Sequence, residues 1–174
     1  MTAGRRDLSA ARTCLIAWLA SIGFFALGVW GIGRWGSGIL PDRLWSDEYD
    51  YRHALNGAAA GFVLLFALFW LLVFLLGTAR LRADSRAVAK ANALFVAALL
   101  AALVLCLLHA APALFATWTD ACMRNYLRAH PGDGCLDCGI HRCDAHVAFD
   151  VILAGTLIVA ALMAASLWLR WKAR

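Results

Sequence analysis

Four of the six cysteines lie close together in one segment, and their spacing is the strongest sign of chemistry in this chain. The segment also contains a Gly/Asp-rich stretch at 131–134 with too little apolar content to order itself. In an oxidising compartment, such cysteines usually form disulfides that take the place of a hydrophobic core. We therefore predict two disulfides, with three possible connectivities, among Cys122, Cys135, Cys138 and Cys143.

Two other kinds of chemistry fit the same segment. The pair Cys135-x-x-Cys138 has the spacing of two thiols that exchange a disulfide, and the other cysteines could relay electrons to it. In general plan the chain resembles small four-span thiol oxidases of the DsbB type, although their C-x-x-C pair lies in the first outward loop. Histidines interleaved with the cysteines suit zinc or copper instead, namely His130, His141 and His146.

A second group of ionisable residues is expected at one level inside the membrane, in the outer leaflet. It comprises His53, His109, His146 and Asp150. His146 and Asp150 are four positions apart and share one helix face, so the group could hold a metal, ligate haem b or relay protons. Structural roles are the alternative. Asp150 suits the first turn of a helix, and His109 could donate a hydrogen bond to a backbone carbonyl that Pro112 deprives of its helical partner.

The elements that must position these residues are transmembrane helices. The chain of 174 residues is 63% hydrophobic and only 16% charged, a composition outside the usual range for soluble domains. The apolar residues fall into separate blocks that reach or exceed the ~20 residues needed to cross a bilayer as a helix. We predict an all-α membrane protein, a single domain spanning 1–174, with helices at about 14–33, 54–77, 91–118 and 147–169 and a disulfide-bearing outward loop at 119–146.

The distribution of charge predicts the orientation of this bundle. Ten of the sixteen Lys and Arg residues precede span 1, lie between spans 2 and 3, or follow span 4. The other two loops are short and hold most of the acidic residues. The positive-inside rule then places both termini in the cytoplasm, or in its matrix or stromal equivalent, with the cysteines facing outward. The same basic face could also hold anionic lipid.

Small residues at the start of the second span predict a place where another helix approaches closely. Gly57 and Gly61 are four positions apart with alanines between them, which is a small-xxx-small pattern. The partner helix could belong to the same bundle or to another chain, and the sequence does not choose between them.

These patterns favour a non-catalytic protein over an enzyme. The sequence contains no nucleotide-binding glycine loop, nucleophile elbow or zinc-protease pair, and no basic run that indicates nucleic acid binding. We expect a small tetraspan scaffold or accessory subunit in the bilayer, whose partners are other membrane subunits or a second copy. The alternative is a membrane redox, metal or haem protein that uses the loop cysteines or the outer-leaflet histidines.

Overall fold

The computed structural model describes residues 3–39, 51–81, 86–110, 116–132 and 136–174, and the regular secondary structure within them is helical. Side chains are described for 8–35, 55–81, 86–110, 120–132 and 150–174. Within these ranges, four helices are long and apolar enough to cross a membrane: α1 (Ala3–Ile39), α2 (Tyr51–Leu75), α3 (Arg86–Ala110) and α5 (Leu136–Lys172). Two shorter helices are η2 (Thr78–Arg80) and α4 (Ala116–Ala129). The prediction of four long apolar helices is therefore confirmed, and their length and composition suit a lipid bilayer.

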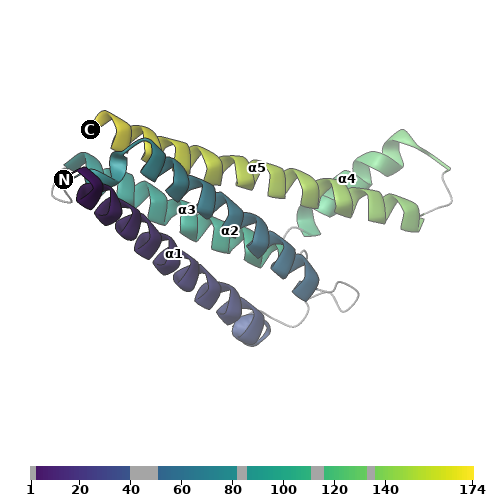
Figure 1. Cartoon of the computed structure of the whole chain (residues 1–174). Helices are drawn as coiled ribbons and strands as arrows, with labels where there is room; N and C mark the ends of the chain where they lie inside the picture. Colours follow the sequence, from purple (N-terminus) through teal and green to yellow (C-terminus); the bar gives the residue numbers. More distant parts are fainter. Residues whose placement is uncertain (1–2, 40–50, 82–85, 111–115, 133–135) are drawn as a thin grey trace.

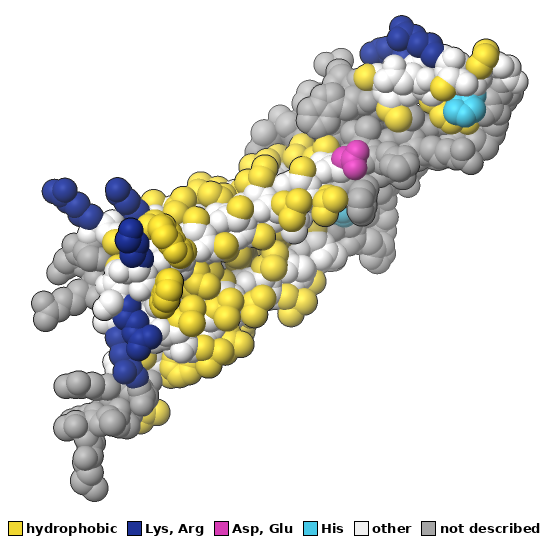
Figure 2. Space-filling model, turned by 90° about the horizontal axis from the view of Figure 1, so that it is seen from above, with side chains coloured by type: hydrophobic (Ala, Val, Ile, Leu, Met, Phe, Trp, Pro, Cys, Tyr) yellow, Lys and Arg dark blue, Asp and Glu magenta, His cyan; other side chains and the backbone are white. Residues whose placement is uncertain are grey.

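The four long helices form an elongated bundle (Figure 1). Helices α2 and α3 contact each other, and each of them also contacts both α1 and α5. The start of α1 and the end of α5 lie at the same end of the bundle, here called the terminal end, together with η2 and the start of α3. Side chains of Lys and Arg gather at this end, and hydrophobic side chains cover the length of the bundle beyond it (Figure 2).

The segment between the third and fourth predicted spans differs most from the sequence prediction. Helix α3 ends at Ala110, well before the predicted boundary at position 118, and α4 forms a separate helix inside the predicted loop. Pro112 lies between these two helices, in a stretch outside the described residues. Helix α5 also begins earlier than predicted, at Leu136. Helix α4 and the first part of α5, residues 136–149, together extend beyond the other helices, and we call this pair the arm (Figure 1).

Aromatic side chains fill the centre of the bundle. Phe25 of α1 packs edge-on against Phe66 of α2, with ring centroids 5.2 Å apart. Phe66 in turn contacts Phe95 of α3, and Phe95 stacks on Phe69 at 4.7 Å with nearly parallel rings. Edge-to-face and offset-stacked pairs contribute ~0.5–1.5 kcal/mol each beyond the area that they bury. Phenylalanines therefore link α1, α2 and α3 through one continuous aromatic core.

Glycines allow close packing at two places that the sequence analysis did not identify. A Cβ atom added at Gly28 of α1 would lie 2.7 Å from Cδ2 of Leu103, which is too close for a real contact. At Gly155 of α5, an added Cβ would lie only 2.9 Å from Cδ1 and 3.0 Å from Cγ of Leu105. Each glycine therefore makes room for a leucine of α3, and these contacts hold α1 and α5 against that helix.

Candidate functional site

A pair of polar contacts joins α5 to α3 near the terminal end. Ser166 is fully buried, and its hydroxyl donates a hydrogen bond of 2.7 Å to the backbone carbonyl of Ala91. One turn further along α5, the Arg170 guanidinium donates a hydrogen bond to the side-chain oxygen of Asn92. Because Ser166 and Arg170 are four positions apart, both point from the same face of α5 toward α3. We call these four residues the polar clasp.

Arg170 is a buried charge within a membrane-spanning segment. Its side chain is only 7% exposed. Its Cζ atom lies 5.5 Å from the ring centroid of Trp70 and 6.0 Å from that of Phe69, both on α2. Such cation–π contacts stabilise a desolvated guanidinium by about 2 kcal/mol. The Arg170 Nε atom is nevertheless buried without a hydrogen-bond partner among the described residues.

The polar contacts continue from α2 to α1. The Trp70 indole N–H donates to the hydroxyl oxygen of Ser21 at 3.3 Å, and the Ser21 hydroxyl donates to the Trp18 carbonyl at 2.8 Å. Together with the polar clasp, these contacts connect all four long helices at one level. Polar groups inside a bilayer are costly unless they are paired, so this layer fixes the mutual register of the helices.

Sequence reasoning missed this layer for a specific reason. Arg170 follows the last predicted span, so it was assigned to the flanking charges that set topology. In the structure α5 continues to Lys172, which places Arg170 inside the helical bundle. The available signal was the spacing of Ser166 and Arg170 on one face, together with Asn92 near the start of a largely apolar span.

His109 lies in the last turn of α3, one residue before its end. It lines a half-open cavity of about 200 Å³ between α2, α3 and α5. The walls are mostly apolar and include Gly61, Phe62 and Leu105, and Thr156 supplies a second polar side chain. An apolar cavity with a few polar groups is the usual form of a small-molecule site, although this one is smaller than the ~300–1,000 Å³ typical of such sites. An imidazole and a hydroxyl here could orient a small apolar molecule that carries one polar atom.

The structure does not assemble the rest of the predicted histidine and aspartate group among the residues that it describes. Asp150 is exposed at the start of the fourth predicted membrane span and does not line the His109 cavity. The side chains of His53 and His146 lie outside the described residues. Within the described part of the chain, no three His, Cys, Asp or Glu side chains come close enough to hold a metal ion. The metal and haem hypotheses thus stay predictions.

The cysteines divide into two kinds. Cys14 of α1 and Cys106 of α3 are buried as free thiols and pack in the core as small apolar residues. Cys122 of α4 is disulfide-bonded, and its partner lies outside the described residues. Cys135 and the side chains of Cys138 and Cys143 are also outside them. The number of disulfides and their connectivity stay predictions.

Gly57 and Gly61 of α2 have open space around them rather than a described helix against them. A Cβ added at Gly57 or at Gly61 would meet no atom within 4 Å. Both glycines are exposed, as are their neighbours Asn56 and Ala60. Contact of this face with another helix, of the same bundle or of another chain, stays a prediction.

Comparison with known proteins adds no further assignment to these features. No family model matches the chain, and no similar protein was found either among curated proteins or among solved structures.

Proposed function

We propose that this protein is a small tetraspan accessory subunit that binds a larger membrane protein through its arm and through the open face of α2. It carries out no reaction itself. The supporting observation is the arm, because a helical hairpin that extends beyond the bundle offers a recognition surface outside the lipid.

The length of α5 determines how far the arm extends. The helix has 37 residues, which correspond to about 55 Å at 1.5 Å per residue, whereas the hydrocarbon core is about 30 Å thick. The described apolar part of α5 is Asp150–Lys172, and the helix itself begins at Leu136, so its length exceeds one crossing of the bilayer. Helix α4 packs alongside α5 and is amphipathic, with Cys122 and Tyr126 on its partly buried side and Leu127 exposed. A partner could bind this exposed side of α4.

A disulfide gives the arm a fixed shape in this proposal. A bridge from Cys122 that closes a loop of ~15 residues would stabilise it by ~3 kcal/mol in the chain-entropy model. We propose that Cys135, Cys138 and Cys143 complete two bridges on the outward, oxidising side, while the terminal end faces the cytoplasm. A pre-ordered arm loses less conformational entropy when it binds, which favours tight association.

The open face of α2 supplies a second contact within the bilayer. Gly57, Ala60 and Gly61 together form a smooth strip without large side chains, and no described helix covers it. A helix of a partner could approach this strip closely, since packing of small residues is a main source of helix association in lipid.

Site-specific photo-crosslinking in native membranes tests this proposal. A photoreactive amino acid would replace Leu127 on α4 or Gly57 on α2, and Leu100 on the exposed side of α3 would serve as the lipid-facing control. We expect positions 127 and 57 to crosslink to the same membrane protein and position 100 to crosslink only to lipid. That membrane protein should also co-purify in fixed stoichiometry after gentle solubilisation.

The alternative function would give a different preparation. A protein that purifies alone, with a haem absorption band or stoichiometric copper, would contradict the accessory-subunit proposal. It would instead favour a redox or metal protein, and the cavity at His109 would then be the first place to look for the bound group.

A further inference from the structure

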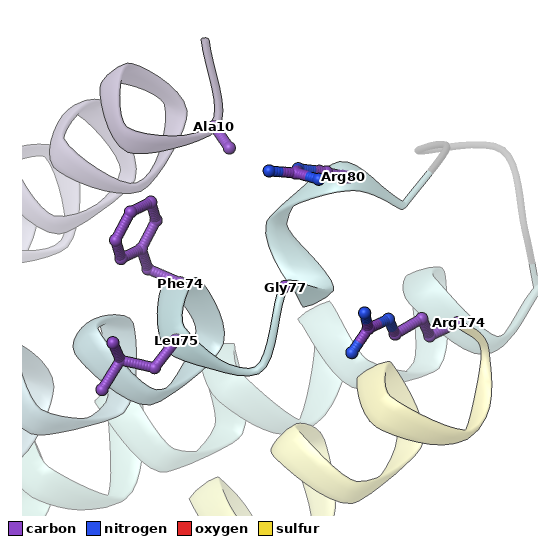
Figure 3. Close-up of a pocket in the computed structure, with 6 residues that line it drawn as sticks. All are labelled: Ala10, Phe74, Leu75, Gly77, Arg80 and Arg174. Atoms are coloured by element: carbon purple, nitrogen blue, oxygen red, sulfur yellow. The ribbon is translucent and has the colours of Figure 1, made fainter. Parts of the chain in front are cut away.

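A cavity at the terminal end combines two guanidinium groups with an apolar wall. Its volume is about 310 Å³, and it lies between the start of α1, the end of α2, η2 and the end of the chain. In Figure 3 the Arg80 side chain extends toward Ala10 of α1, whereas Arg174 extends toward Gly77. Phe74 and Leu75 form the apolar side of the same cavity.

The position of this cavity matches the boundary between hydrocarbon and headgroups. The apolar span of α2 ends at Leu75, the span of α5 ends at Lys172, and Ala10 lies near the start of α1. Phe74 and Leu75 therefore lie at the edge of the apolar region, and Arg80 and Arg174 lie just beyond it. A ligand that fills the cavity would meet cations on its polar side and hydrocarbon on its apolar side.

The backbone around Gly77 places one of the two cations. Gly77 has φ +66°, a conformation that L-residues with a side chain rarely adopt, and it turns the chain from α2 into η2. The turn brings the Leu76 carbonyl to Arg174, whose Nη1 donates a hydrogen bond to it at 3.0 Å. A guanidinium has five N–H donors, so Arg174 can keep this bond while it binds an anion.

We propose that this cavity binds the phosphodiester headgroup of one anionic phospholipid, with the Arg80 and Arg174 guanidinium groups on the phosphate and the acyl chains along Phe74 and Leu75. Guanidinium groups recognise phosphate by paired, charge-assisted hydrogen bonds. The volume of the cavity is at the lower end of the ~300–1,000 Å³ found for small-molecule sites, which suits a headgroup rather than a whole lipid.

The apolar wall favours a lipid over a free phosphate ion. A small anion would use the arginines alone and would leave Phe74, which is 37% exposed, and Leu75, which is 66% exposed, without a role. Several further cations at the terminal end, including Arg12, Arg86 and Lys90, would enrich anionic lipid near the cavity. These cations do not line the cavity, so they attract anionic lipid to the whole terminal end and not to this cavity in particular.

Native mass spectrometry of the full chain in a neutral detergent tests the site. The protein would be titrated with phosphatidylglycerol or with phosphatidylcholine of the same acyl chains. We expect the first phosphatidylglycerol to bind about tenfold more tightly than phosphatidylcholine, because both carry the phosphodiester but only phosphatidylcholine adds a cation that the two guanidinium groups repel. The double variant Arg80→Gln/Arg174→Gln should lose this preference. Arg86→Gln removes one charge at the same end of the bundle, outside the cavity, and should retain it.

Three results would overturn the proposal. They are equal binding of both lipids, equal loss of preference in Arg86→Gln, and complete displacement of phosphatidylglycerol by inorganic phosphate at matched ionic strength. The last result would identify free phosphate as the ligand.

A measurement on the unaltered protein covers the case in which the double variant does not fold. Phosphatidylglycerol with a photoreactive acyl chain should label the peptide that contains Phe74 and Leu75 several-fold more than the peptide around Leu100. Equal labelling of the two peptides would show ordinary lipid contact and would overturn the site.

Discussion

Arg170 of α5 donates a hydrogen bond to Asn92 of α3, although 78 positions separate them in the sequence. The guanidinium is buried between α3 and the aromatic rings of Phe69 and Trp70, so Asn92 supplies a neutral oxygen where a carboxylate would be the usual partner. Removing the amide would leave the charge with cation–π contacts alone, whereas removing the charge would leave only an exposed amide.

This asymmetry predicts a non-additive double-mutant cycle. Asn92→Leu should destabilise the protein by about 1–2 kcal/mol, because it removes a hydrogen bond from a buried cation. Arg170→Met should cost less, since replacing a buried charge by an apolar side chain is often close to neutral. The double variant should resemble Arg170→Met, which gives a coupling of about 1 kcal/mol. Unfolding in mixed micelles measures these values, and strictly additive effects would show that the contact contributes nothing.

Glycine positions predict a second contrast in stability. Gly155→Ala should destabilise the protein by about 1–3 kcal/mol. The added Cβ would lie only 3.0 Å from Cγ of Leu105, so more than the flexible end of the leucine would have to move. Gly57→Ala meets no atom, so it should be neutral or stabilise α2 by up to about 1 kcal/mol. Thermal unfolding in detergent compares the two variants directly. Equal destabilisation of both would mean that the α3–α5 contact at Gly155 is not tight.

Reporter fusions test the orientation that the charge distribution predicts. Green fluorescent protein fused after Arg174 should fluoresce, and alkaline phosphatase fused there should be inactive, because the terminal end is expected in the cytoplasm. Alkaline phosphatase inserted at Gly132, which follows α4 with φ +101° and has open space around it, should be active. The reverse pattern would contradict the positive-inside argument for this chain.

The thiol state of the cysteines is the fourth prediction. Alkylation without reductant, followed by mass spectrometry, should leave the four outward cysteines unmodified in two disulfides. Cys14 and Cys106 should react only after the bundle unfolds, because both are buried free thiols. The variant Cys106→Ser is the control, because it removes one alkylated thiol and should leave the disulfides unchanged. Alkylation of any outward cysteine before reduction would contradict the two-bridge hypothesis.

Sequence patterns were sufficient for the spans but not for their contacts. Hydropathy predicts the four apolar helices because a bilayer requires long uninterrupted segments. It does not predict which small residues meet a neighbour, and Gly28 and Gly155 make the close contacts, whereas Gly57 and Gly61 do not. That outcome depends on how each helix is rotated about its axis, which the large share of Ala and Leu in these spans leaves undefined.

Segments outside the membrane were harder to predict because other signals dominated them. The cysteines and the Gly/Asp-rich stretch suggest an irregular loop, and they hide the helical spacing of the partly buried residues in α4. Ala121, Cys122 and Tyr126 are partly buried there, and the spacing of the last two matches one face of a helix. The charge count likewise assigned Arg170 to solvent, because it cannot distinguish a flanking cation from one held by aromatic rings.

The unbroken length of α5 gives the molecule a mechanical property. One rigid rod runs from the arm to Ser166 and Arg170, with no interruption in its helical backbone. A tilt of the outer part of this helix would therefore tilt the inner part as well. The close contact of Gly155 with Leu105 lies near the middle of the helix, so the helix would pivot about it. Force applied on one side of the bilayer then reaches the opposite side as a displacement of α5 against α3, without any change in secondary structure.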